Sequence, residues 1–209
     1  DKNQINLGPV LTEVSAPVID YSSIKVPELK VPGQHNILDA QAAKAVGLSL
    51  NLYESQIDKA LMNFSGTWRR LEYKGQTLAG ALVYDDYAHH PTEIDMALTA
   101  LKEKYPDYQL VAVFQPHLYS RTRDFMNKWP GAFQKADQIL ILPIYAAREQ
   151  LIPQVNSQAV VDLLPTKAEL VLDFQTAEKK LQNLDSKTII AVLGAGDIFR
   201  LSESLISNK

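Results

Sequence analysis

The chain has 209 residues, of which 46% are hydrophobic and 22% charged, and its formal net charge is −3. This composition is typical of a globular protein with room for one large domain, or for one domain and part of another. The slight negative charge gives no general attraction to phosphate polymers, so neither nucleic acid nor a membrane surface is expected as a partner.

Hydropathy and cysteine use restrict the class of protein further. No apolar run approaches the roughly 18 residues of a membrane span, and no stretch resembles a secretory signal, so we expect a cytoplasmic protein. The absence of cysteine excludes disulfides and thiolate metal sites and suits a reducing compartment. The chain begins at Asp1 without methionine, inside a region that reads as rich in strands, and we expect it to be part of a longer protein.

The first third of the chain is predicted to belong to one domain. Residues 1–33 mix short apolar runs with prolines and glycines, which predicts short antiparallel strands at the edge of a sheet. An alanine-rich helix should follow over residues 37–46. His35 and Asn36 directly precede it, and their spacing alone favours a capping pair over a functional one.

A second helix is predicted over residues 55–64, where Ser55 and Asp58 form a weak capping-box pattern. Ser65-Gly66 then breaks the helical pattern. We therefore place a domain boundary near residue 66, which gives domains over 1–66 and 67–209.

The second domain alternates between apolar strands and amphipathic helices, which predicts an α/β fold with a mostly parallel sheet and helices on both faces. The predicted strands are 80–84, 110–114, 139–142, 169–172 and 188–193. The predicted helices are 91–104, 122–136, 157–164, 176–183 and 197–206. Phe125, Trp129 and Phe133 recur at helical spacing and are expected in the core.

Polar residues follow four of the predicted strands. These segments are 85–90, 115–121, 143–149 and 194–197. Because the carboxyl ends of parallel strands share one edge of a sheet, three of the four histidines should gather there with several charged and hydroxyl groups. A domain without a ligand has no need of such a concentration, so this edge is the predicted functional site.

The separate features of this edge are less specific. Asp85 and Asp86 could be functional acids or ordinary charges near a helix start. His90 and Glu93 share a helical face but supply only two ligands, so no metal site is predicted. Arg121 lies at the start of a predicted helix, where the macrodipole disfavours a cation, and this favours an anionic ligand there.

Five motifs in this order resemble the Mur ligases, in particular those that join L-alanine to UDP-N-acetylmuramate in peptidoglycan biosynthesis. The motifs are Gly33-Gln34-His35-Asn36, Arg69-Arg70-Leu71-Glu72, Asp85-Asp86-Tyr87-Ala88-His89-His90-Pro91-Thr92-Glu93, Gln115-Pro116-His117 with Ser120-Arg121, and Gly194-Ala195-Gly196-Asp197-Ile198. The third motif is highly specific, and together the five span nearly the whole chain.

The resemblance implies that residues 1–66 are the C-terminal part of the family's central ATP-binding domain. Residues 67–209 would then be its Rossmann-like C-terminal domain. The family's phosphate-binding loop is absent from this sequence, so the N-terminal domain and most of the central domain would be missing. The chain alone is therefore not expected to catalyse a reaction.

The chemistry implied is ATP-dependent amide formation with Mg²⁺, in which a muramyl carboxylate becomes an acyl phosphate that the amine of L-alanine attacks. The nucleotide-binding residues implied are His35, Asn36, Arg70 and Asp86. The residues implied around the amino acid and the acyl centre are Tyr87, His89, His117 and Arg121, the last three as catalytic residues. One departure is Leu118, where many relatives have arginine, which leaves the carboxylate contacts of alanine open.

Two rival interpretations remain open on the sequence. A related recycling ligase attaches a whole tripeptide to the same UDP-sugar, although its likeness around Pro116 and His117 is weaker. Alternatively, the chain could be a nucleotide-binding or interaction domain without catalysis.

Overall fold

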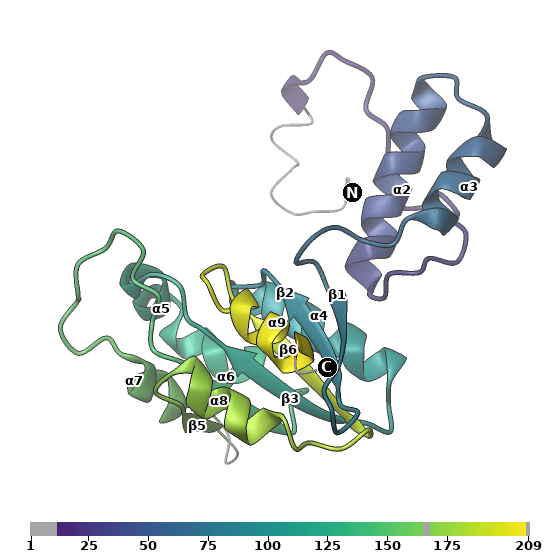
Figure 1. Ribbon diagram of the computed structural model, residues 1–209. Coiled ribbons are helices and arrows are strands. Elements are labelled where there is room, and N and C mark those ends of the chain that lie inside the picture. Colours follow the sequence, from purple (N-terminus) through teal and green to yellow (C-terminus); the bar gives the residue numbers. More distant parts are fainter. Residues whose placement is uncertain (1–11, 165–167, 208–209) are drawn as a thin grey trace. The chain divides into compact units, whose positions relative to one another are not determined.

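The structure, a computed structural model, describes residues 12–164 and 168–207 (Figure 1). It divides into two compact units, Asp1–Ser65 and Gly66–Lys209. None of the described helices is long and apolar enough to cross a lipid bilayer.

The first unit contains the helices α2 (Gln34–Ser49) and α3 (Glu54–Asn63). The antiparallel strands expected before them are wrong for residues 12–33, which hold no strand, and residues 1–11 lie outside the described part. Prolines in this stretch lack the N–H group that a strand ladder needs, which accounts for the difference.

Helix α2 begins three residues earlier than predicted, directly after Gly33, whose φ is 104°. His35 and Asn36 therefore lie in its first turn, and neither side chain caps a backbone N–H group of the helix. The Nδ2 group of Asn36 instead donates to the Pro32 carbonyl at 2.6 Å. The predicted capping pair is wrong, because the left-handed glycine starts the helix before these residues.

A buried lysine joins the two helices of this unit. The Nζ atom of Lys44 lies 2.6 Å from Asp58 Oδ1 and 2.8 Å from Glu54 Oε1. The predicted capping box of Ser55 and Asp58 is thus wrong: α3 begins at Glu54 without a side-chain cap, and Asp58 pairs with Lys44 across the helix interface. The pattern of one helix could not reveal this tertiary partner.

The second unit is built on a six-stranded sheet of order β1-β2-β6-β3-β4-β5. Its strands are β1 (Glu72–Gln76), β2 (Leu82–Asp86), β3 (Gln109–Phe114), β4 (Gln138–Ile141), β5 (Ala168–Leu170) and β6 (Thr188–Leu193). Only β1 is antiparallel to its neighbour; the remaining pairs are parallel. The predicted mostly parallel α/β sheet is confirmed, whereas the edge strand β1 was missed because its residues are polar and its register shifts beside Gly75.

Helices cover both faces of this sheet (Figure 1). They are α4 (Pro91–Lys104), α5 (Tyr119–Asp124), the 3₁₀ turn η2 (Met126–Lys128), α6 (Trp129–Ala132), α7 (Ser157–Val161), α8 (Phe174–Leu181) and α9 (Phe199–Ser207). One core contains α4, α6 and α7, and the other contains α8 and α9. Alternate residues of β3 and β6 enter the two cores, which accounts for the continuous apolar strands in the sequence.

The prediction of one continuous helix over residues 122–136 is wrong. The chain instead forms α5, η2 and α6, because Pro130 has no N–H group to continue a helical ladder. The expected core positions are still filled: Trp129 and Phe133 are buried, and Phe125 packs against them. The Trp129 indole N–H donates to the Thr122 carbonyl at 3.2 Å and closes the break.

Candidate functional site

Strand β2 carries the two adjacent acids to the edge of the sheet. Asp85 and Asp86 were expected on the loop after the strand, but both belong to β2 and pair with Val192 and Leu193 of β6. Parallel pairing therefore continues two residues further than the apolar run in the sequence. Both side chains are buried, so the loop proper begins at Tyr87.

The loop after β2 ends in a well-formed helix cap. The Thr92 N–H donates to His90 Nδ1 at 3.2 Å, and Glu93 Oε2 accepts from the N–H groups of His89 and His90 at 3.0 and 3.1 Å. Burial works against the charge of Glu93, but these backbone donors outweigh it and hold the pKa of its carboxyl below the usual range. His90 and Glu93 thus serve the cap, and the described residues contain no group of three potential metal ligands.

The loops after β2 and β3 bring four predicted site residues together. The ring centroids of Tyr87 and His89 are 5.5 Å apart, and those of His89 and His117 are 6.1 Å apart. Arg121 Nη1 lies 3.2 Å from His117 Nδ1. Tyr87, His89, His117 and Arg121, hereafter the histidine cluster, therefore lie at one place although β6 separates β2 from β3 in the sheet.

Burial and then the positive charge of Arg121 lower the pKa of His117 below its ordinary value. Its imidazole is therefore neutral at pH 7. The Tyr145 ring stacks on that of His117 with centroids 5.6 Å apart and planes inclined by 16°. Tyr145 comes from the loop after β4, where its N–H donates to the Pro116 carbonyl at 2.8 Å. Sequence reasoning assigned Tyr145 no role; its position directly after a predicted strand was the available signal.

The sequence argument for an anion at Arg121 is partly wrong. Arg121 lies in the last turn of α5, where the macrodipole favours a cation, because the helix begins at Tyr119 and not at residue 122. The guanidinium of Arg121 can nevertheless bind an anionic ligand, because it is not engaged by an acid of this chain's described part. Over the described residues, no ion pair joins Arg121 to a carboxylate, and its hydrogen bond goes to an imidazole nitrogen.

The residues predicted at the nucleotide are divided between the two units. Arg70 is exposed, and its guanidinium carbon lies 5.7 Å from the Tyr87 ring centroid. The two carboxylate oxygens of Asp86 accept from the N–H groups of Leu71 and Ala88, at 2.6 and 2.7 Å. His35 and Asn36 belong to the first unit and are described only there.

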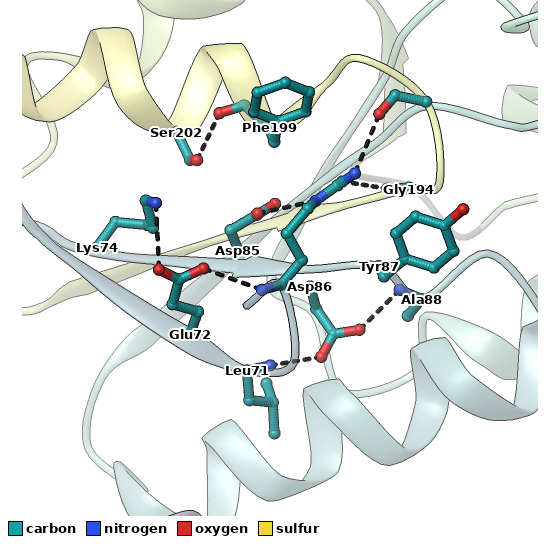
Figure 2. Close-up of polar contacts among 12 residues, drawn as sticks. Leu71, Glu72, Lys74, Asp85, Asp86, Tyr87, Ala88, Gly194, Phe199 and Ser202 are labelled. Carbon is teal, nitrogen blue, oxygen red and sulfur yellow. Dashed lines mark hydrogen bonds and ion pairs between the residues drawn. The ribbon is translucent and has the colours of Figure 1, made fainter. Parts of the chain in front are cut away.

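A buried ion pair lies beside the cluster, and sequence reasoning missed it. Arg69 Nε donates to Asp85 Oδ2 at 3.0 Å, Nη1 donates to the Gly196 carbonyl at 3.1 Å, and Nη2 donates to the Gly194 carbonyl. Figure 2 shows Asp85 and Gly194 in this network, with the Tyr87 ring alongside. The Arg-Arg and Asp-Asp doublets were visible in the sequence, but not which arginine is buried or which aspartate pairs with it.

The pH dependence of stability offers a test of this buried pair. Burial raises the pKa of Asp85 to about 6 although Arg69 opposes the shift, from an ordinary value of 3.8. The folded state therefore holds a proton that the unfolded state has lost, so this contribution to stability falls as pH rises from about 4 to about 6. We expect Asp85→Asn to remove that fall, which amounts to at most about 1.4 kcal/mol per pH unit.

The measurement is urea unfolding followed by tryptophan fluorescence between pH 4 and 7. Asp173→Asn is the control, because bonds from Thr176 lower the pKa of Asp173 and its contribution is lost only as pH falls through about 4 and below, so its stability difference from the parent chain should stay nearly constant over most of this range. A constant stability difference between Asp85→Asn and the parent chain over this range would contradict the assignment.

Comparisons with known proteins identify the family to which this chain is similar. Residues 69–196 match the family model described as Mur ligase, glutamate ligase domain. The chain is 40% identical over 186 residues to the UDP-N-acetylmuramate–L-alanine ligase of Desulfatibacillum aliphaticivorans, covering 87% of this chain and 41% of that protein. It is 42% identical over 183 residues to the ligase of the same name from Agathobacter rectalis, covering 86% and 39%.

A solved structure agrees as well. The crystal structure of UDP-N-acetylmuramate-alanine ligase from Thermotoga maritima has a TM-score of 0.71 to this chain at 30% identity, over 85% of this chain and 38% of that one. The chain thus spans about 40% of the length of the curated relatives it matches. With a family match over most of its second unit and the same fold as a solved member, the chain belongs to the Mur ligases.

Proposed function

We propose that this chain is the C-terminal portion of an ATP-dependent ligase that joins L-alanine to UDP-N-acetylmuramate in the cytoplasm, during peptidoglycan biosynthesis. The observation that carries the proposal is the histidine cluster, in which a guanidinium without an ion pair among the described residues lies beside a neutral imidazole. The names of the similar proteins support L-alanine as the amino acid.

Each unit has a separate part in this proposal. The first unit would be the end of the central ATP-binding domain, with His35 and Asn36 near the adenine. The second would contribute Arg70 and Asp86 to binding of the nucleotide's ribose or phosphates. Arg70 fits an anionic group because it is exposed and has no ion pair within the described residues. The described residues of this chain offer no three-ligand metal site, so Mg²⁺ would be held by the triphosphate and the rest of the enzyme.

The histidine cluster would act on the amino acid. ATP supplies the phosphoryl group that activates the muramyl carboxylate. The Arg121 guanidinium would hold the alanine carboxylate, because its planar fork matches the two oxygens of a carboxylate. Because Arg121 donates to His117 Nδ1, the neutral imidazole carries its proton on Nε2 and Nδ1 is its acceptor. His117 would accept a proton at Nδ1 from the alanine nitrogen as the amide bond forms, once the Arg121 guanidinium has turned from Nδ1 to the alanine carboxylate. His89 and Tyr87 would form the wall on the side of β2.

A chimeric enzyme tests this function directly. The chain would replace the matching C-terminal part of the Thermotoga maritima ligase, and phosphate release would be measured with UDP-N-acetylmuramate, ATP and L-alanine. We expect turnover that depends on all three. Turnover with the tripeptide acceptor instead of L-alanine would favour the recycling ligase.

The isolated chain provides the second test. Calorimetry is expected to show no micromolar binding of ATP, because the phosphate-binding loop is not part of this sequence. Micromolar binding to the isolated chain, together with an inactive chimera, would favour a nucleotide-binding domain without catalysis.

A further inference from the structure

The adjacent residues Arg69 and Arg70 of the second unit lie in different environments. Arg70 is exposed, whereas Arg69 is buried and each of its three guanidinium nitrogens has an acceptor. The acceptors are one oxygen of Asp85 and two backbone carbonyls of the loop that follows β6. Arg69 is only 2% exposed, and three of its five N–H groups are bonded within the chain, so we expect it to act through the groups it holds.

The first of these groups is the glycine loop, residues 194–196. A Cβ atom added to Gly196 would lie 2.6 Å from Gln115 Oε1 and 2.8 Å from Tyr145 Cγ. The loop backbone thus packs directly against the Tyr145 ring, and that ring stacks on His117. A shift of the Gly196 carbonyl would move Tyr145 and with it His117.

The second group is the ring of Tyr87. The guanidinium carbon of Arg69 lies 5.1 Å from the Tyr87 centroid, and the Tyr87 N–H donates to the Arg69 carbonyl at 2.8 Å. The Tyr87 ring in turn meets His89 edge to face, with planes inclined by 87°. This second route reaches the histidine cluster from the side of β2.

We propose that Arg69 is a positioning residue, which holds both histidines of the cluster through the glycine loop and Tyr145 on one side and through Tyr87 on the other. The importance of these positions for alanine rests on the proposed function, but the positions themselves are testable without it. Lysine cannot replace Arg69, because one ammonium group cannot donate to Asp85 and to two carbonyls in a plane while lying on an aromatic ring.

The four histidines of the chain give the readout. Their imidazoles are followed through a pH titration by NMR of the ¹⁵N-labelled 209-residue chain. The variant Arg69→Met with Asp85→Asn removes the guanidinium without leaving an unpaired buried carboxylate. We expect the His117 pKa to rise toward its ordinary value, because looser packing by Tyr145 lessens its burial. The His89 signals should shift as well.

Two internal controls and two matched variants test whether the change is specific to the histidine cluster and to Arg69. His90, fixed in the α4 cap, and His35, in the other unit, should keep their imidazole chemical shifts at a given pH. Arg70→Met should leave His117 unchanged, and so should Asp85→Asn alone, since Arg69 keeps its two carbonyl acceptors.

An unchanged His117 titration curve together with unchanged His89 signals in the folded double variant would overturn the proposal. If that variant does not fold, Arg69→Lys is measured in its place; it retains a cation beside Asp85 and is still expected to move His117, and an unchanged curve would overturn the proposal equally. An inactive chimera would leave these NMR results as they stand, so failure of the proposed function and failure of the positioning role are distinguishable.

Discussion

Arg121→Ala is expected to raise the KM for L-alanine in the chimeric ligase by roughly 10- to 100-fold while leaving the KM for ATP nearly unchanged. A charge-assisted hydrogen bond to a carboxylate contributes about 1.5 to 3 kcal/mol, and its loss falls on the substrate that carries the carboxylate. Arg121 has no competing ion pair within the described residues, so its guanidinium is available for this contact. Initial rates at varied L-alanine and ATP concentrations measure both constants.

Arg123→Ala is the matched control for this result. Arg123 lies on the same helix two residues away, but it is exposed and pairs with its neighbour Asp124 at 2.8 Å. We expect this variant to retain both Michaelis constants. Equal losses for L-alanine and ATP in Arg121→Ala would refute the assignment of Arg121 to the amino acid.

The same variant carries a second signature in its pH dependence. The charge of Arg121 helps to lower the pKa of His117, so removing that charge should raise this pKa. If neutral His117 accepts the proton, the acidic limb of the kcat/KM profile should move to higher pH in Arg121→Ala. An acidic limb at the same pH as in the parent would argue against His117 as the proton acceptor.

Asp86→Ala is expected to lower the stability of the fold and also to weaken the use of ATP. Its carboxylate accepts from the N–H groups of Leu71 and Ala88, and each donor left buried without a partner costs about 1–3 kcal/mol of folding free energy. If Asp86 also meets the nucleotide, the KM for ATP should rise in the chimera. The structural effect is thus added to the nucleotide role that the family resemblance predicts for this residue.

Asp86→Asn separates the two contributions. Asparagine keeps one acceptor oxygen, so we expect a smaller loss in urea unfolding of the isolated chain, with enough folded protein for kinetics. Asp124→Asn, at an exposed acid on α5, is the control for a change of charge alone. An unchanged KM for ATP in folded Asp86→Asn would limit Asp86 to holding the loop after β2.

Several parts of the fold could be predicted from the sequence because their signals are local. The apolar runs of β3 and β6 reflect strands buried on both faces, and the helical spacing of α4 reflects one buried face. Strand β1 lacks that signal, because an edge strand needs few apolar residues. The helix predicted over 122–136 failed at Pro130, where a missing N–H group outweighed an apolar periodicity that did correctly indicate the core.

The candidate site also has a part that the sequence could predict and a part that it could not. The sequence by itself determined that polar loops follow parallel strands and therefore meet at one edge, and the family resemblance selected Tyr87, His89, His117 and Arg121 from these loops. Only the tertiary structure decided that Arg69 is the buried member of its doublet, since its acceptors Gly194 and Gly196 lie 125 and 127 residues away along the chain. Periodicity and capping patterns report on near neighbours, whereas the partner of a buried charge depends on which distant backbone the fold brings to it.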